Sequence, residues 1–210
     1  MPPLNSIIPV ILAAGDSTRM GYPKALLPLG SDTFLSHIIY TARTAGLGNP
    51  TIVLGRSASA IQSTVKLQQV EVLINPNPNR GQLSSIQMAL TSLEPDCNAV
   101  MIWPVDQPLV SVELIEALAC LFLDTGSLIA SPVVGEKRGH PVIFRKDLFP
   151  EFMATPLDEG SKPIMTRHRE HTVSLPTEEV GTVFDIDTPS DYETACGRKL
   201  EAVLKSGRCL

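Results

Sequence analysis

Residues 7–24, IIPVILAAGDSTRMGYPK, join an apolar run to a loop of small and charged residues. The run Ile7–Ala13 has the length and composition of a strand that is buried on both faces. Small residues directly after such a strand let the backbone approach a ligand, and successive N–H groups in that turn form an anion-binding concavity. Arg19 and Lys24 add positive charge. The stretch therefore predicts a phosphate-binding loop at the carboxyl end of the first strand. The alternative is an ordinary strand-to-helix connection with surface charges.

Apolar runs alternate with helical patterns along most of the remaining chain. Further strands are expected at Thr51–Leu54, Val70–Ile74 and Ala99–Trp103, with helices at Thr33–Ala45, Ser57–Leu67, Gln82–Leu93 and Val112–Leu123. This order predicts an α/β fold, a Rossmann-like three-layer sandwich with a mostly parallel, mixed sheet.

The pattern changes after Leu128. We expect strands at Leu128–Val134 and Pro141–Phe144 around the turn Gly135–Gly139, a mobile loop at Asp158–Lys162, short strands at Val173–Leu175 and Thr182–Phe184, and a last helix from near Pro189 past Leu200. A loose tail is expected over residues 203–210. Repeats and domain linkers are not apparent, so residues 1–210 are predicted to form a single domain.

The composition limits the classes of partner. The chain has 210 residues, 43% of them hydrophobic, with a formal net charge of −5 and no basic cluster longer than Lys137-Arg138. We therefore expect no nucleic-acid partner. The apolar run near the N-terminus is shorter than a membrane span, so no membrane partner is expected either. Because Cys97, Cys120, Cys196 and Cys209 show no CxxC or metal-ligand spacing, free thiols in a cytoplasmic setting are expected.

Acidic residues follow two later segments. Asp106 comes three residues after the end of the predicted strand Ala99–Trp103, and Asp185 and Asp187 precede a predicted helix. Mg²⁺ prefers oxygen ligands and keeps several waters, so one or two carboxylates can hold it. The alternatives are an aspartate that caps a turn at residue 106 and a helix-entry turn capped by Asp187 or Thr188.

The stretch LAAGDSTRMGYPKALLPLG, residues 12–30, resembles the N-terminal signature of nucleotidyltransferases, approximately LAAGxSxRMGxxKxLLxxxG. It has neither the GxxxxGK[ST] of a P-loop nor the GxGxxG of a dinucleotide-binding fold. The branch it resembles most transfers a nucleotide to the molybdopterin cofactor. LAAG, rather than LAGG, is similar to the molybdenum cofactor cytidylyltransferases, which use CTP. The resemblance implies a fold of the nucleotide-diphospho-sugar transferase type.

The resemblance also implies roles for residues that match the family's motifs. Base and phosphates would lie against Leu12, Ala13, Ala14, Gly15 and Ser17, with Arg19 and Lys24 on the phosphates. The NPxxxxGxxSS segment would place Asn75, Gly81 and Ser84 near the base and ribose. In the DQP and DIDTP segments, Asp106 and Asp187, the latter ahead of Asp185, would bind Mg²⁺ or Mn²⁺. His140 in GHPV and, more loosely, Lys162 would meet the acceptor, although DEGSK departs from the family's GDxGAR-like loop.

The predicted reaction is attack by the phosphate of a molybdopterin-type acceptor on the α-phosphate of an NTP, with CTP preferred, releasing pyrophosphate. Arg19, Lys24 and Asp106 are the expected catalytic residues. The resemblance further implies transient contact with a molybdoenzyme or its chaperone. Two alternatives stay open: transfer to a sugar phosphate or another phosphorylated alcohol, and a non-catalytic chaperone that binds the cofactor.

Overall fold

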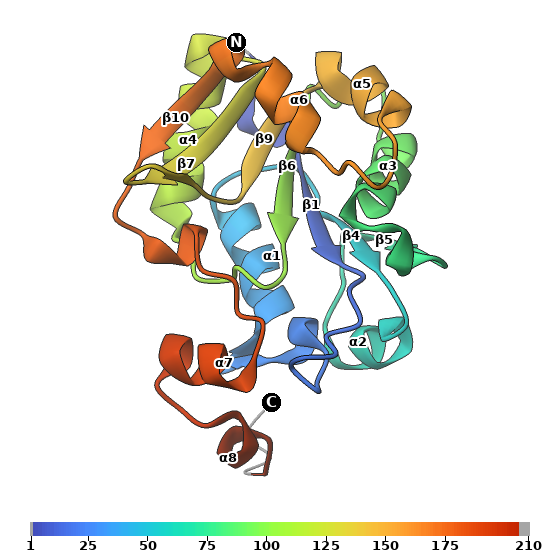
Figure 1. The fold of residues 1–210 in the computed structure, drawn as a ribbon, viewed down its shortest axis with the longest axis vertical. Helices are drawn as coiled ribbons and strands as arrows, with labels where there is room; N and C mark the ends of the chain where they lie inside the picture. Colours follow the sequence, from blue (N-terminus) through green and yellow to red (C-terminus); the bar gives the residue numbers. More distant parts are fainter. Residues whose placement is uncertain (1, 206–210) are drawn as a thin grey trace.

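The computed structural model describes residues 2–205 (Figure 1). Its strands are β1 (Ile7–Ala13), β2 (Pro28–Leu29), β3 (Asp32–Thr33), β4 (Thr51–Leu54), β5 (Glu71–Ile74), β6 (Ala99–Pro104), β7 (Ile129–Val134), β8 (Lys137–Arg138), β9 (Val142–Arg145) and β10 (Thr172–Pro176). Its α-helices are α1 (Phe34–Thr44), α2 (Ala58–Thr64), α3 (Gln82–Ser92), α4 (Val112–Thr125), α5 (Phe149–Ala154), α6 (Lys162–Arg167), α7 (Pro189–Cys196) and α8 (Leu200–Lys205).

The main sheet has the order β10-β7-β9-β6-β1-β4-β5, and β8 pairs with β7 at the side. β1 lies parallel to both β4 and β6, and β9 runs antiparallel between β6 and β7. The predicted mixed, mostly parallel α/β sheet is therefore confirmed. Because β1, β4 and β6 are parallel, the loops that follow them emerge at one edge of the sheet, the lower edge in Figure 1.

The two faces of the sheet are covered by different helices. Alternate residues of β1 serve the two sides: Ile7 and Ile11 pack in the cluster that contains α1 and α4, whereas Val10 and Leu12 pack against α3, α5 and α6. This alternation follows from the period of two along a strand, and it makes β1 apolar on both faces. The three layers place β1 at the centre of the molecule, with its carboxyl end free to carry a site.

Several element predictions need correction. Residues 182–184 are not a strand, since Val180–Thr182 form a 3₁₀ helix. This segment packs directly on the loop at Leu109, because a Cβ on Gly181 would lie 1.8 Å from the backbone oxygen of Leu109. The last helix is broken at Gly197, whose φ of 66° ends α7 in a left-handed cap. α2 ends at Thr64 rather than Leu67, because Val65 is already extended.

The segment Asp158–Lys162 consists of turns up to residue 161, and Lys162 begins α6. Of the predicted loose tail, residues 203–205 belong to α8 and the remainder lies outside the described residues.

Candidate active site

The loop after β1 is folded around Ser17. The Ser17 backbone oxygen accepts hydrogen bonds from Met20 N at 3.1 Å and Gly21 N at 3.0 Å, and Ser17 Oγ accepts one from Lys24 N at 3.2 Å. Ser17 has a φ of 52°, a left-handed conformation that non-glycine residues seldom adopt. Strained backbone of this kind gathers at ligand sites, and here it turns the chain so that Arg19 and Lys24 face the same side.

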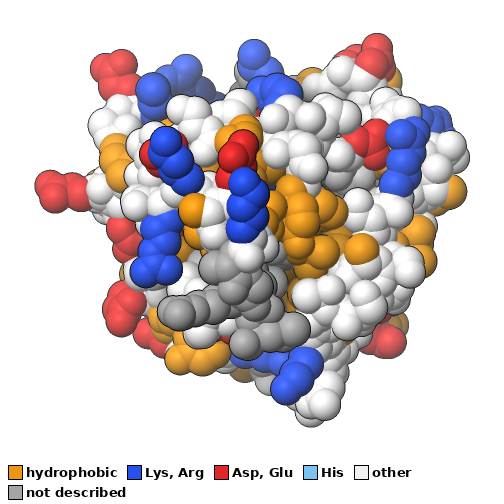
Figure 2. Space-filling view, turned by 90° about the horizontal axis from the view of Figure 1, so that it is seen from below, with side chains coloured by type: hydrophobic (Ala, Val, Ile, Leu, Met, Phe, Trp, Pro, Cys, Tyr) orange, Lys and Arg blue, Asp and Glu red, His pale blue; other side chains and the backbone are white. Residues whose placement is uncertain are grey.

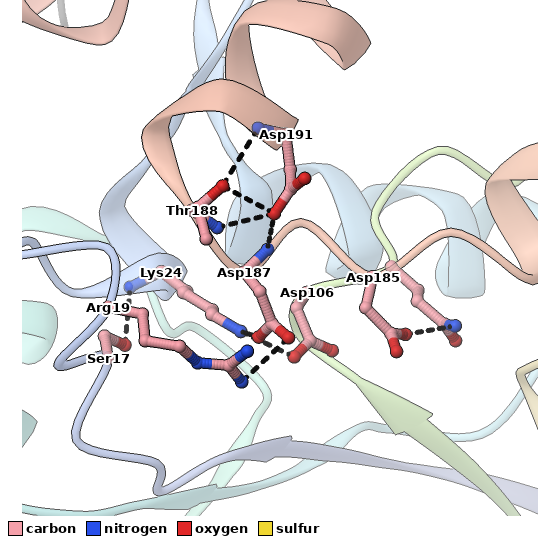
Figure 3. A network of polar contacts seen from close by, with 9 residues as sticks. Ser17, Arg19, Lys24, Asp106, Asp185, Asp187, Thr188 and Asp191 are labelled. Atoms are coloured by element: carbon pink, nitrogen blue, oxygen red, sulfur yellow. Dashed lines mark hydrogen bonds and ion pairs between the residues drawn. The ribbon is translucent and has the colours of Figure 1, made fainter.

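Two carboxylates from distant segments meet these cations (Figure 3). Lys24 Nζ lies 2.8 Å from Asp106 Oδ2 and also contacts Asp187 Oδ1. Arg19 Nη2 lies 2.8 Å from Asp187 Oδ2. The Lys24 side chain is only 12% exposed, whereas that of Arg19 is 69% exposed. The structure thus brings Arg19, Lys24, Asp106 and Asp187 together at one point.

Backbone pairing explains why these segments meet. β1 and β6 run in register up to the pair Leu12 and Pro104, and Val105 N donates to Leu12 O at 3.1 Å. Asp106 therefore emerges beside the start of the phosphate loop. Ile186 N then donates to Asp106 O at 3.0 Å, which fixes the segment before α7 next to the end of β6.

The N-terminus of α7 holds Asp187 from the other side. Thr188 and Asp191 form a capping box, in which Asp191 N donates to Thr188 Oγ1 and Asp191 Oδ2 accepts from Thr188 N at 2.8 Å. The same Asp191 oxygen accepts from Asp187 N at 3.2 Å. The predicted helix-entry turn is therefore present with Thr188 as its cap, while Asp187 lines the cavity and its binding of a metal stays a prediction.

Charges in the cluster stabilise one another. The hydrogen bond from Lys24, with smaller effects from its charge and from Arg19, holds the pKa of Asp187 below its ordinary value. Burial lowers the pKa of Lys24, but Asp106 and Asp187 outweigh it, so the pKa is raised overall. Lys24 is thus an ammonium and Asp187 a carboxylate throughout the neutral range.

A second polar group, made by Gln107 and Asp185, lies close to Asp106. Gln107 Nε2 donates to Asp185 Oδ1 at 2.7 Å. Burial, followed by the charges of Asp106 and Asp187, raises the pKa of Asp185. Burial lowers the pKa of His140, against the opposing fields of Asp185 and Asp106. His140 is therefore a neutral side chain near the carboxylates at neutral pH.

A cavity of about 330 Å³ opens at this edge of the sheet. Its lining includes the following residues expected from the sequence: Leu12, Ala13, Ala14, Gly15, Ser17, Arg19, Lys24, Gly81, Asp106 and Asp187. The lining mixes the apolar strand end with the charged cluster, a combination typical of a small-molecule site.

Four expected residues lie elsewhere. Asn75 is buried and its amide nitrogen donates to Ser84 Oγ at 2.9 Å and Ser85 Oγ at 3.0 Å, so Asn75 and Ser84 fasten the loop before α3 to the helix and do not line the cavity. Lys162 is exposed at the start of α6 and lines a separate depression. His140 does not line the cavity either, although it lies within the field of Asp106. Ligand contacts by these four residues stay predictions, as do those of the residues that line the cavity.

Sequence inspection missed other residues at the site. Pro78, just before α3, and Gln82, at its first turn, line the cavity, as does Ser85, which the segment after Gly81 had suggested as a donor. The glycine before a helix was a signal for that wall, since the free N–H groups there favour anions and polar ligands. Arg56 was also missed, and its Nη1 lies 3.0 Å from Asp16 Oδ2 in the phosphate loop. A single arginine after β4 carries no motif, so only the three-dimensional structure could reveal this pair.

The carboxylates Asp106 and Asp187 fit a divalent cation. Their oxygens converge on one point, where they share the Lys24 ammonium. Two carboxylates with space for waters suit Mg²⁺ or Mn²⁺, which need few protein ligands. Among residues 2–205, no group of three or more His, Cys, Asp or Glu side chains is arranged to hold a metal by itself. Any metal here would consequently need oxygens from substrate or water.

Comparison with known proteins places the fold and the site in context. A family model described as the MobA-like NTP transferase domain matches residues 9–173. The chain is 24% identical over 199 residues to the molybdenum cofactor cytidylyltransferase of Escherichia coli, and the alignment covers 94% of this chain and 100% of that protein. It is 33% identical over 111 residues to the bifunctional protein GlmU of Paraburkholderia phytofirmans. That match covers 52% of this chain and only 24% of GlmU, so the chain spans about a quarter of that relative.

Among solved structures, Rv0371c from Mycobacterium tuberculosis superposes with a TM-score of 0.82 at 27% identity, covering 91% of this chain and 98% of that one. A complex of Rv0371c with manganese superposes with a TM-score of 0.73 at 25% identity, again covering 91% and 98%.

The family match assigns this arrangement, a mostly parallel sheet with a glycine-containing loop, two cations and facing carboxylates, to the class of nucleotidyltransferases. The chain belongs to the MobA-like NTP transferase family, whose model spans well over half of it. The resemblance inferred from residues 12–30 and the fold type it implied are thereby confirmed.

The face of the molecule seen from below is mixed in charge. Lys and Arg side chains lie among acidic ones, and a patch of hydrophobic side chains lies near the centre (Figure 2). Within residues 2–205, no helix is both long and apolar enough to cross a membrane.

Proposed function

We propose that the protein transfers a nucleoside monophosphate from an NTP, with CTP preferred, to the phosphate of a molybdopterin-type acceptor and releases pyrophosphate. The observation that carries this proposal is the convergence of Arg19 and Lys24 with Asp106 and Asp187 at the mouth of the cavity. The E. coli cytidylyltransferase, which aligns over 94% of the chain, supports the choice of acceptor and base.

In this reaction an acceptor phosphate oxygen forms a bond to the α-phosphorus. The bond from the α-phosphorus to the bridging oxygen breaks, and pyrophosphate leaves with that electron pair. The acceptor phosphate is already ionised at neutral pH, so no strong base is required and catalysis is positioning plus charge stabilisation. Arg19 and Lys24 neutralise the charge that develops on the α-phosphate and on the leaving pyrophosphate.

Asp106 and Asp187 would hold the divalent cation, Mg²⁺ or Mn²⁺. When bound, such an ion supplies charge neutralisation and polarises phosphoryl oxygens. The manganese complex of Rv0371c, a structure of the same fold at 25% identity, supports a cation of this kind. Gly15, Ser17 and the adjacent backbone would cradle the phosphates, while Leu12, Ala13 and Ala14 would lie against the base.

A second candidate acceptor is a sugar phosphate or another phosphorylated alcohol, because the similarity of this chain is not confined to cytidylyltransferases. GlmU is 33% identical over 111 residues, a stretch with higher identity than the cytidylyltransferase alignment. A sugar phosphate would meet the same nucleotide loop and carboxylates, so turnover with each acceptor distinguishes the two candidates.

The test is pyrophosphate release with CTP, GTP and UTP, each supplied with molybdopterin or with a set of sugar phosphates. We expect CTP with molybdopterin to be turned over fastest. Asp106→Asn should lower that rate by about 100-fold or more, because one carboxylate of the cation site is lost. Asp96→Asn, an exposed change before β6 and outside the cavity, is the control. Turnover with sugar phosphates alone would overturn the acceptor, and full activity of Asp106→Asn would overturn the role of the carboxylates.

A further inference from the structure

Gln107 has a buried side chain that takes no part in the proposed reaction. It is 3% exposed, and its Nε2 donates to Asp185 Oδ1 at 2.7 Å. Its Oε1 is buried without a hydrogen-bond partner in the described part of the chain. Burying an amide with one unsatisfied end is costly, so this position needs a reason.

The backbone of Gln107 is held rigidly. Trp103, fully buried in β6, donates from Nε1 to Gln107 O at 2.9 Å, and Gln107 N donates to Pro104 O at 3.2 Å. These bonds fold the chain back on itself directly after β6. The side-chain amide therefore projects from a fixed base, which is what a residue needs in order to orient another group.

Asp185 differs from the other two carboxylates in its partners. Within residues 2–205, the site's cations Lys24 and Arg19 pair with Asp106 and Asp187 but not with Asp185. Figure 3 shows the Asp185 carboxylate pointing away from Asp187 and the Lys24 ammonium. Asp185 thus faces Gln107 and not the point at which a cation would bind.

Together these contacts attach the segment 185–187 to the end of β6 at two points. One is the Gln107 to Asp185 hydrogen bond, and the other is the backbone bond from Ile186 N to Asp106 O at 3.0 Å. Side chains alternate along an extended segment, but the capping box turns residue 187 at the entry to α7. Gln107 fixes residue 185 and the cap fixes residue 188. The backbone of Asp187 between them is therefore restrained so that its side chain faces Asp106.

We propose that Gln107 and Asp185 are positioning residues, which hold Asp187 opposite Asp106 so that the two can bind a divalent cation, and that Asp185 is not itself a ligand. This inference rests on the proposed function, because it assigns the cation to Asp106 and Asp187. It predicts that the hydrogen bond between residues 107 and 185 is required, and that the negative charge on residue 185 is not.

The test measures Mn²⁺ affinity by electron paramagnetic resonance, alongside the midpoint of thermal unfolding of the metal-free protein. Gln107→Leu should weaken Mn²⁺ binding by about tenfold or more, the usual effect of losing a residue that orients a metal ligand. Asp185→Asn should stay within about threefold of the wild type, since Asn Oδ1 still accepts from Gln107. Gln107→Glu should weaken binding because two carboxylates then face each other. The double variant Gln107→Glu with Asp185→Asn, which exchanges donor and acceptor, should restore it.

Gln87→Leu is the matched control for stability. Gln87 Nε2 donates to Phe152 O at 2.9 Å and Thr155 O at 3.2 Å, away from the site. This variant should lower the unfolding midpoint and leave Mn²⁺ affinity unchanged. If Gln107→Leu behaves in the same way, Gln107 is only structural and the inference is wrong. If Asp185→Asn weakens Mn²⁺ binding as much as Asp187→Asn, Asp185 is itself a ligand and the inference is also wrong.

Failure of the proposed function has a different signature. In that case Asp106→Asn and Asp187→Asn would also leave Mn²⁺ affinity unchanged. Loss of affinity in those two variants, without rescue by the donor–acceptor exchange, would overturn the positioning role alone.

Discussion

Lys24 stands between two carboxylates that a divalent cation also requires. Its ammonium is 2.8 Å from Asp106 Oδ2 and contacts Asp187 as well. A triphosphate offers the ammonium a new set of oxygens, so nucleotide binding would draw Lys24 away and free the carboxylates. Lysine and metal then compete until the nucleotide arrives, which favours entry of metal and nucleotide together.

This competition predicts that loss of the Lys24 charge lowers turnover but raises the affinity for a divalent cation. Lys24→Met should lower turnover by about 100- to 1,000-fold, because a charge that stabilises the reacting phosphates is lost. In the absence of nucleotide, the same variant should bind Mn²⁺ about three- to tenfold more tightly, because the competing charge is gone. Kinetics and Mn²⁺ titration measure the two effects, with the exposed residue Lys66 changed to Met as the control. Weaker Mn²⁺ binding by Lys24→Met would contradict the competition.

Asp185 gives a pH-dependent prediction. Burial and the charges of Asp106 and Asp187 raise its pKa in the folded protein above the ordinary value of 3.8. A raised carboxyl pKa stabilises the fold below the unfolded pKa, and this stability is lost as pH rises through the folded pKa. Asp185→Asn, which imitates the protonated form, should therefore be more stable than the wild type at pH 7. The difference should vanish at or below about pH 3.8. Denaturant titrations at several pH values measure it, and a variant less stable at neutral pH would refute this account.

At the scale of elements, the phosphate loop is fastened to the end of β4. A Cβ on Gly55 would lie 2.2 Å from Ala14 O, so the two backbones touch where only glycine fits. One residue further on, Arg56 pairs with Asp16 at 3.0 Å. Asp16 lies between Gly15 and Ser17, which both line the cavity, so its negative charge would oppose a triphosphate unless Arg56 neutralised it.

Arg56→Ala should accordingly raise the KM for NTP by about two- to fivefold, within the range of about 1 kcal/mol that exposed ion pairs reach. Asp16→Ala should not raise it, and the double variant should return it to the wild-type value. Steady-state kinetics at low and high salt measure the effect, which salt should weaken. The exposed pair Arg145 and Asp147, 2.6 Å apart and outside the cavity, is the control. Additive increases from both single variants would disprove neutralisation.

The regular elements were predictable because their signals are local. The core strand Ile7–Ala13 and the helix after Ser111 follow from an apolar run and from an N-cap serine, which accepts from Leu114 N at 3.1 Å. α5 was missed because Pro150 obscures a short helix that is fixed mainly by burial of Phe152 against Phe144. The strand predicted at residues 182–184 was wrong because this segment bonds to a loop distant in the sequence and not to a neighbouring strand: His140 N donates to Thr182 O at 2.8 Å.

The site divides in the same way. Arg19, Lys24, Asp106 and Asp187 could be found because strand ends of a parallel sheet share one edge and the motifs mark those ends. The contacts of Gln107 and Arg56 could not, because each has one partner, Asp185 or Asp16, that folding brings close from a distant or motif-free segment.

At the scale of the whole molecule, β6 runs through the hydrophobic core and ends at the candidate active site. Asp106 follows its carboxyl end, and Cys97 precedes its start, where the thiol donates to Ala99 O at 3.2 Å. Cys97 is 5% exposed and burial raises its pKa to about 11, whereas Cys120 on α4 is exposed. A thiol reagent at pH 8 can therefore reach Cys97 only when the molecule opens.

Ligand binding should suppress that opening. In the proposed function, NTP with Mn²⁺ binds the folded site only, so at about 100 times Kd it adds about 2.7 kcal/mol and lowers the population of the open state roughly 100-fold. Labelling of Cys97 by N-ethylmaleimide should slow by that factor, while labelling of Cys120 should not change. Peptide mass spectrometry over time distinguishes the thiols, and Asp106→Asn, which weakens the cation site, should lose most of the protection. Equal rates for Cys97 and Cys120, or no effect of ligand on Cys97, would show that the two ends of β6 do not open as one unit.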